Sequence, residues 1–156
     1  METTLIILKP DAVQRGLMGR IITRFEEKGL QVVGCKMMRI SSQLAETHYE
    51  SHKGKPFYDG LVMFMTSSPV LVLALRGNAA ITIARGMMGA TFGSKANPGT
   101  IRGDFGVSNS FNLIHGSDSP DAAARELKLF FKPDEVLNWT RASETWVYDL
   151  SNGKAE

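Results

Sequence analysis

The sequence predicts an α+β fold in which one antiparallel sheet has helices packed on one of its faces. Compact apolar runs, typical of buried strands, alternate with stretches of helical periodicity. The alternation follows the order strand, helix, strand twice, with an interruption between, which is the order of a ferredoxin-like βαββαβ sheet. Because the chain has 156 residues, we expect one domain over 1–156 with a sizeable core, ending in a C-terminal tail over 141–156.

The first strand, helix and strand are expected within the first forty residues. The first apolar run ends at Lys9-Pro10, because proline cannot donate to a sheet ladder. The helix then places Ile21, Ile22 and Phe25 on one face. We expect strands over 4–8 and 30–40, a helix over 17–28, and a connector over 11–16.

The interruption is expected to contain two helices. Ser41 or Ser42 is a suitable N-cap for a helix that continues to Tyr49. An apolar stretch over 57–65 suits a second, short helix, since residues that favour turns stand on both sides of it.

The second unit begins with a buried strand and a helix capped by Asn78. A glycine-rich segment follows, with a proline and little periodicity, and we expect it to be a long loop of functional importance. We expect strands over 70–75 and 111–115, helices over 78–88 and 122–131, and the loop over 91–110.

A candidate site centres on residues 112–118, Asn-Leu-Ile-His-Gly-Ser-Asp. An apolar run followed by Gly116 indicates a strand end and a sharp turn, and Ser119-Pro120 opens a helical pattern. His115 is therefore expected near a helix N-terminus, whose unpaired amides attract anions. An imidazole in that position is a candidate nucleophile toward a phosphoryl group, although a lone histidine at a turn is more often structural.

Three cationic residues stand at breaks in the pattern, where a ligand can approach the backbone. Lys9 ends the first strand, Arg85 lies near the end of its helix, and Arg102 lies in the glycine-rich segment. Arginine side chains match phosphate oxygens in pairs, and lysine acts as a movable point charge. In the predicted fold Lys9 and His115 both lie at strand ends and could meet.

Composition and motifs argue against several classes of protein. The net charge of +2 and the aliphatic strands argue against a nucleic-acid partner. The chain shows no signal peptide pattern and no apolar run of membrane-spanning length, and its single cysteine, Cys35, suits a reducing compartment, so we expect a cytoplasmic protein without a membrane partner. Neither a P-loop nor a dinucleotide fingerprint is present. His48 and His52 could share a metal, but a solvated helix face is the favoured interpretation.

Taken together, these motifs resemble the nucleoside diphosphate kinase family. The similarity extends from about residue 4 to about residue 148. Its most specific part is the signature Asn112-x-x-His115-Gly116-Ser117-Asp118, and three further segments match the family, at 8–11, 55–57 and 97–104.

The resemblance implies reversible transfer of the γ-phosphoryl group from a nucleoside triphosphate to a nucleoside diphosphate. It implies a ping-pong route through phosphorylated His115. It also implies Mg²⁺ held mainly by the nucleotide phosphates rather than by protein side chains. Family members form homo-oligomers, and the Trp146-containing tail favours a hexamer, with a tetramer as the alternative.

The resemblance further implies roles for individual residues. His115 would attack through Nδ1, Glu126 would orient the imidazole, and Ser117 would hold that carboxylate. Lys9, Asn112 and Tyr49 would lie near the sugar and terminal phosphate. Arg85, Thr91 and Arg102 would bind the phosphates, and Phe57 and Leu61 would contact the base.

Stacking on Phe57 would explain broad base tolerance, because every base has a π face. Asn109 departs from the family pattern, since an apolar residue often stands there, and this leaves one base-side contact open. Two other functions remain open: a ferredoxin-like module that senses a nucleotide without transferring phosphate, and a nucleic-acid-binding protein that uses the same sheet.

Overall fold

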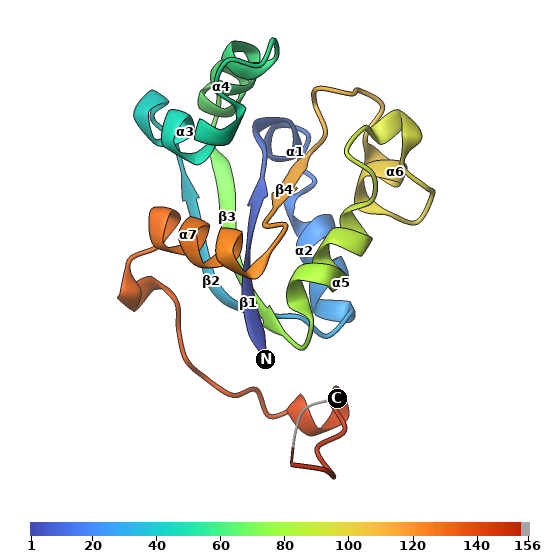
Figure 1. Ribbon diagram of the computed structural model, residues 1–156. Helices are drawn as coiled ribbons and strands as arrows, with labels where there is room; N and C mark the ends of the chain where they lie inside the picture. Colours follow the sequence, from blue (N-terminus) through green and yellow to red (C-terminus); the bar gives the residue numbers. More distant parts are fainter. Residues whose placement is uncertain (154–156) are drawn as a thin grey trace.

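The computed structural model describes residues 1–153, so the last three residues of the expected tail lie outside the described part. A four-stranded antiparallel sheet forms its centre, with the strand order β2-β3-β1-β4 (Figure 1). This order confirms the predicted ferredoxin-like α+β fold. The strands are β1 (Glu2–Leu8), β2 (Gln31–Met38), β3 (Val70–Gly77) and β4 (Ile114–Gly116).

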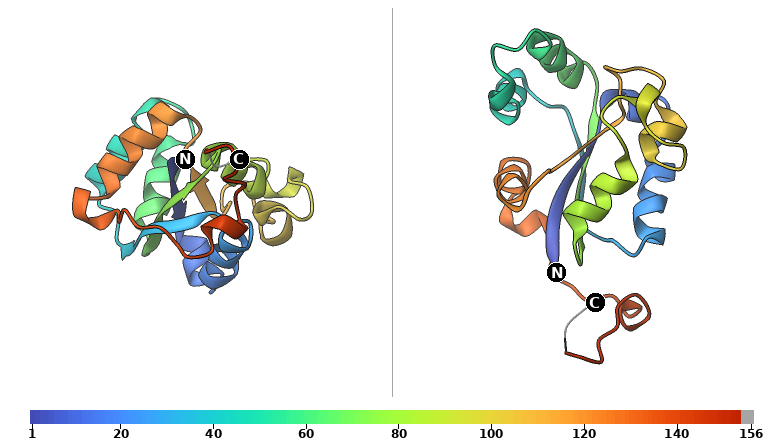
Figure 2. Two further views of the ribbon diagram at one scale, coloured as in Figure 1. Left: turned by 90° about the horizontal axis from the view of Figure 1, so that it is seen from below. Right: turned by 45° about the vertical axis from the view of Figure 1, so that its right-hand side comes forward.

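Helices cover both faces of the sheet (Figures 1 and 2). The two crossover helices, α2 and α5, pack on one face, as the prediction expected. The opposite face is covered by α3, α4 and α7, which the prediction of helices on one face did not include. The α-helices are α1 (Pro10–Gln14), α2 (Met18–Glu27), α3 (Ser42–His48), α4 (Tyr58–Thr66), α5 (Ala80–Met88), α6 (Ile101–Phe105) and α7 (Pro120–Phe130), and the 3-10 turns are η1 (Glu50–His52), η2 (Gly93–Lys95), η3 (Pro133–Glu135) and η4 (Glu144–Trp146).

The central strands β1 and β3 are apolar almost without alternation because both of their faces are buried. In β1, Ile6 and Leu8 face one core with Phe25 of α2, whereas Leu5 and Ile7 face the other core. Successive side chains of a strand point to opposite faces, so a single apolar run supplies both cores.

Several local predictions were wrong in detail. The expected connector over 11–16 is largely the short helix α1, which begins at Pro10. The N-cap of α5 is Ala79, and the carboxylate of Glu2 accepts the Ile81 N–H at 3.0 Å, so Asn78 is not the capping residue. The long loop over 91–110 contains η2 and α6, whose N-cap Thr100 accepts the Gly103 N–H.

After η3 the chain first stays bonded to the sheet, where the Leu137 N–H donates to the Val33 carbonyl of β2 and Gln31 and Arg76 donate to the Trp139 carbonyl. The tail then packs at the far end of the molecule (Figure 1). It is attached through Gly29, whose carbonyl accepts hydrogen bonds from Arg141 at 2.5 Å and from Tyr148 at 3.5 Å. Trp146 is 90% exposed. Within residues 1–153, no helix has the length and apolarity needed to cross a membrane.

Candidate active site

A cleft of about 1040 Å³ opens between α3, α4, the 91–112 segment and β4. Of the eleven residues singled out from the sequence, all except Ser117 line this cleft. They come from distant parts of the chain and are brought together by the sheet. The lining members are Lys9, Tyr49, Phe57, Leu61, Arg85, Thr91, Arg102, Asn112, His115 and Glu126.

His115 lies in the middle of β4, paired with Ile7 of β1. Since Ile7 belongs to the core beneath α7, the imidazole points to the same face of the sheet. Its Nε2 lies 3.0 Å from Oε2 of Glu126, and its side chain is 22% exposed. Among the described residues none forms a hydrogen bond with Nδ1, so that nitrogen is available to a ligand in the cleft.

Glu126 is buried in α7 and makes two hydrogen bonds through one oxygen. Besides the bond to His115, its Oε2 accepts the Ser117 hydroxyl at 2.6 Å. Burial alone would raise the pKa of Glu126, but the hydrogen bond and charge of His115, together with the Ser117 bond, outweigh it and lower the pKa to about 2. The side chain is therefore a carboxylate, and it fixes the proton of His115 on Nε2.

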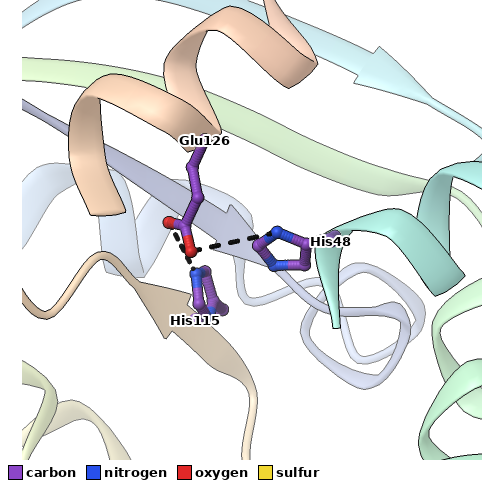
Figure 3. Close-up of side chains that lie close together, drawn as sticks. All are labelled: His48, His115 and Glu126. Carbon is purple, nitrogen blue, oxygen red and sulfur yellow. Dashed lines mark hydrogen bonds and ion pairs between the residues drawn. The ribbon is translucent and has the colours of Figure 1, made fainter. Parts of the chain in front are cut away.

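His48 completes a cluster that the sequence analysis did not foresee (Figure 3). Its ring packs edge-on against His115, with centroids 4.6 Å apart, and its Nδ1 lies 3.9 Å from Glu126 Oε1. The expected solvated helix face is wrong for His48, which is 4% exposed. Burial, followed by the charge of His115, lowers the pKa of His48 to about 3, so the ring is neutral at physiological pH.

The ligand atoms of His48, His115 and Glu126 lie within 4.8 Å of one another, a spacing that a metal ion could occupy. Two imidazole nitrogens are poor ligands for Mg²⁺, which prefers oxygen. A Glu126 oxygen is also already committed to Ser117 and His115. The cluster therefore does not fit Mg²⁺, and its chemistry is that of an oriented imidazole.

Lys9 and Asn112 form a buried polar contact beside the histidine. Lys9 Nζ donates to Asn112 Oδ1 at 2.7 Å, and Asn112 Nδ2 donates to the Thr91 carbonyl at 2.9 Å. Burial, followed by the charge of Arg102, lowers the pKa of Lys9 to about 8. An ammonium group held in so dry a position is a strong partner for an anion that enters the cleft.

Arg102 is buried and donates mainly to backbone carbonyls. Nε donates to Asn112 at 3.1 Å, Nη2 to Ile114 at 2.6 Å and Nη1 to Gly89 at 3.1 Å. Arg85 donates to the Gly116 carbonyl at 3.1 Å. Both arginines thus hold backbone beside His115, a role that the sequence analysis did not assign. Their role toward phosphate stays a prediction.

The far end of the cleft is aromatic and apolar. Phe57, Leu61 and Phe64 follow the spacing of one face of α4, and Phe57 is 52% exposed. Phe64 stacks on Phe111 with centroids 4.5 Å apart and planes 18° from parallel. The sequence analysis missed this pair because it placed Phe111 inside a strand, whereas β4 begins only at Ile114.

Comparison with known proteins relates the chain to one family. A sequence profile described as nucleoside diphosphate kinase matches residues 2–136. The nucleoside diphosphate kinase of Carboxydothermus hydrogenoformans is 56% identical over 149 residues, which is 96% of this chain and 100% of that protein. The corresponding protein of Archaeoglobus fulgidus is 49% identical over 149 residues, which is 96% of this chain and 99% of that protein.

Solved structures agree with the sequence comparison. A halophilic nucleoside diphosphate kinase from Halobacterium salinarum, in complex with CDP, superposes with a TM-score of 0.93 at 52% identity, covering 95% of this chain and 99% of that one. A transition-state mimic of the Borrelia burgdorferi enzyme, with bound vanadate and ADP, superposes with a TM-score of 0.89 at 36% identity, covering 93% and 95%.

The buried neutral His48 predicts a pH dependence of stability. Its pKa is about 3 in the folded chain and 6.5 as the ordinary value, so the unfolded chain binds the extra proton between these values and stability falls as pH falls below 6.5. The slope from this one group is at most about 1.4 kcal/mol per pH unit. Denaturant unfolding between pH 6.5 and 5.5 measures it, because Glu126 takes up a proton in the unfolded chain near its ordinary pKa of 4.5, which lies below that range.

His48→Gln should flatten this slope, while His52→Gln, which replaces a more exposed ring, should change it less. An unchanged slope in His48→Gln would show that His48 is not kept neutral by burial.

Proposed function

Because the chain belongs to the nucleoside diphosphate kinase family and is an enzyme of that class, we propose that it transfers the γ-phosphoryl group by a ping-pong route through phosphohistidine at His115. The observation that best supports this route is the hydrogen bonding of the His115 imidazole. Its Nε2 is held by the Glu126 carboxylate, and its Nδ1 is left for a ligand in a cleft that Lys9, Arg85 and Arg102 line.

In the first step the Nδ1 lone pair attacks the γ-phosphorus of the triphosphate. The P–N bond forms as the bond from phosphorus to the β–γ bridging oxygen breaks, and the diphosphate leaves with that electron pair. The ring gains positive charge, which the adjacent Glu126 carboxylate stabilises while the proton stays on Nε2. In the second step a terminal oxygen of the acceptor diphosphate attacks phosphorus, and the P–N bond breaks to restore the neutral ring.

Cationic side chains supply most of the transition-state stabilisation, because the transferring group spreads its charge over its oxygens. Toward the described residues, Arg85 donates one of its five N–H groups, to the backbone carbonyl of Gly116, so several remain for phosphate oxygens. Lys9 has three N–H groups and donates one of them to Asn112. Arg102 keeps fewer, so its contribution is divided between the backbone and the phosphates.

Mg²⁺ would accompany the nucleotide and would neutralise part of the phosphate charge. The cleft suits an ion held mainly by phosphates, since its lining contains more cationic side chains than carboxylates. With Glu126 committed to His115, Asp118 is the remaining carboxylate along the described lining and would face such an ion.

The base is placed at the apolar end of the cleft, on Phe57 and Leu61. A stack on Phe57 asks for no particular hydrogen-bond pattern, which explains broad base tolerance. Thr91, whose carbonyl is held by Asn112, and the buried Tyr49 complete the contacts around the sugar and phosphates. The Ser94 hydroxyl donates to Asn109 Oδ1 at 2.8 Å, which ties Asn109 to its own loop.

The enzyme is further proposed to be a cytoplasmic homo-oligomer, a hexamer rather than a tetramer, built from one domain per chain. The support is the apolar surface of the C-terminal segment, where Leu137, Trp139 and Trp146 are all exposed. Exposed aromatic side chains of this size are typical of subunit contacts. The free thiol of Cys35 suits the reducing cytoplasm.

Replacing the nucleophile tests the proposed route directly. Incubation with ATP labelled at the γ-phosphate should yield an acid-labile, base-stable phosphate on the wild-type chain, because P–N bonds hydrolyse in acid. His115→Ala should yield none while still binding ADP in calorimetry. Label that persists in His115→Ala, or a wild-type chain that turns over without ever carrying label, would contradict the proposal.

Glu126→Ala tests the support given to the imidazole. Transfer should slow by about 10²- to 10⁴-fold, because the carboxylate aids the bond change without performing it. Single-turnover phosphorylation measured by rapid quench gives the rate. Glu27→Ala, at the exposed end of α2, is the matched control and should behave as the wild type. A wild-type rate in Glu126→Ala would exclude an orienting role.

Phe57→Ala tests the base site. Loss of one stack should weaken nucleotide binding about 5- to 150-fold, and similarly for purines and pyrimidines. Calorimetry with ADP and CDP measures both affinities. Met63→Ala, on the outward face of α4, should leave them unchanged. A loss confined to one base would mean that Phe57 determines specificity.

A further inference from the structure

Leu113 has an unusual backbone conformation two residues before His115. Its φ is +70°, in the left-handed region that residues with a side chain rarely adopt, and the residue is fully buried. The Ile114 N–H donates to the Asn112 carbonyl at 2.8 Å and closes a three-residue turn around it. Such γ-turns with positive φ are rare and strained, so surrounding contacts must hold this one in place.

Both backbone polar groups of Leu113 are bonded to the segment that follows β1. The carboxylate of Asp11 accepts the Leu113 N–H at 3.0 Å through Oδ2. The Lys9 N–H donates to the Leu113 carbonyl at 2.9 Å. Arg102 donates to the carbonyls on either side of the turn, at Asn112 and Ile114. Within residues 1–153, Asp11 thus supplies the one acceptor for the amide at the centre of the turn.

The turn decides where β4 begins and therefore where His115 points. Directly after it, Ile114 pairs with Leu8 and His115 pairs with Ile7. Because side chains alternate across a strand, a shift of one residue would turn His115 away from Glu126 and toward the opposite core. With only three residues, β4 has few ladder hydrogen bonds of its own with which to resist such a shift.

We propose that Asp11 is a positioning residue for phosphoryl transfer: by accepting the Leu113 N–H it maintains the γ-turn that aims His115 at the nucleotide and at Glu126. This inference rests on the proposed function, since it concerns how the nucleophile is oriented. It assigns a task to the acidic residue of the Lys9-Pro10-Asp11 segment, for which neither the sequence analysis nor the phosphate contacts found a use.

A simpler explanation is that Asp11 only stabilises the N-terminus of α1. The chain offers a matched control for this, because the dipeptide Pro-Asp occupies the same first two positions in α1 and in α7. Asp121 is exposed in the first turn of α7 and does not contact Leu113. Replacing Asp121 removes the same helix-terminal charge without touching the γ-turn.

The experiment compares Asp11→Ala, Asp11→Asn and Asp121→Ala in the full chain. We measure the single-turnover rate of His115 phosphorylation at saturating ATP, together with KM for ATP. Asp11→Ala should lower the rate by about 10- to 100-fold, the size expected for a reacting atom displaced by about 1 Å, while KM changes less than about 3-fold. Asp11→Asn keeps an oxygen acceptor and should restore the rate to within about 3-fold of the wild type.

Asp121→Ala should retain the wild-type rate. If Asp11→Ala fails to fold, Asp11→Ser takes its place, because serine suits a helix start and is too short to reach Leu113. A wild-type rate in the folded Asp11 variant would overturn the proposal. An Asp11→Asn variant with a phosphorylation rate as low as that of Asp11→Ala would also overturn the proposal, since the charge of Asp11 and not its hydrogen bond would then determine the rate. Because the wild-type chain is assayed in parallel, failure of the phosphohistidine route itself would appear separately, as absence of labelled enzyme.

Discussion

The pairing of β4 with β1 is the constraint on which the active cleft depends. Only three residues of β4 take part, yet they bring His115 opposite Ile7 and place the Lys9 side chain beside Asn112. Residues more than a hundred positions apart in the chain thereby share one wall of the cleft. The helix that follows, α7, then needs only a short connection to present Glu126 to the imidazole.

The cleft combines one buried carboxylate with several cationic side chains that differ in how many hydrogen bonds hold them in place. Glu126 stays charged because its hydrogen bonds and the charge of His115 outweigh the cost of burial, whereas burial and the charge of His115 keep His48 neutral beside it. Arg102 is immobilised on backbone carbonyls and Arg85 is less so. This division separates a rigid frame, which fixes the backbone around His115, from a cation that keeps more of its N–H groups free.

The sequence was sufficient to predict the sheet, most helices and the set of residues that meet in the cleft. Apolar runs and helical periodicity predict the elements, and the signature around His115 indicates the family. The predictions for His48 and Phe111 were wrong because tertiary contacts determine the environment of both residues. The face of α3 that carries His48 has a pattern typical of a solvated helix, but α7 covers it. The strand predicted to start at Phe111 begins later because of the turn at Leu113. The hydrogen bonds from Arg102 to backbone carbonyls could not be predicted from the local sequence pattern, since they connect segments that meet only in the folded chain.

Cys35, the chain's single cysteine, is exposed on the edge strand β2 and does not line the cleft. Partial burial raises the pKa of its thiol, so the thiolate, which is the reactive species, forms less readily than on a free cysteine. A fluorophore can therefore be attached at one defined point without any cysteine having to be removed first. Dye placed there would report on whatever docks against that sheet edge, from a point outside the cleft.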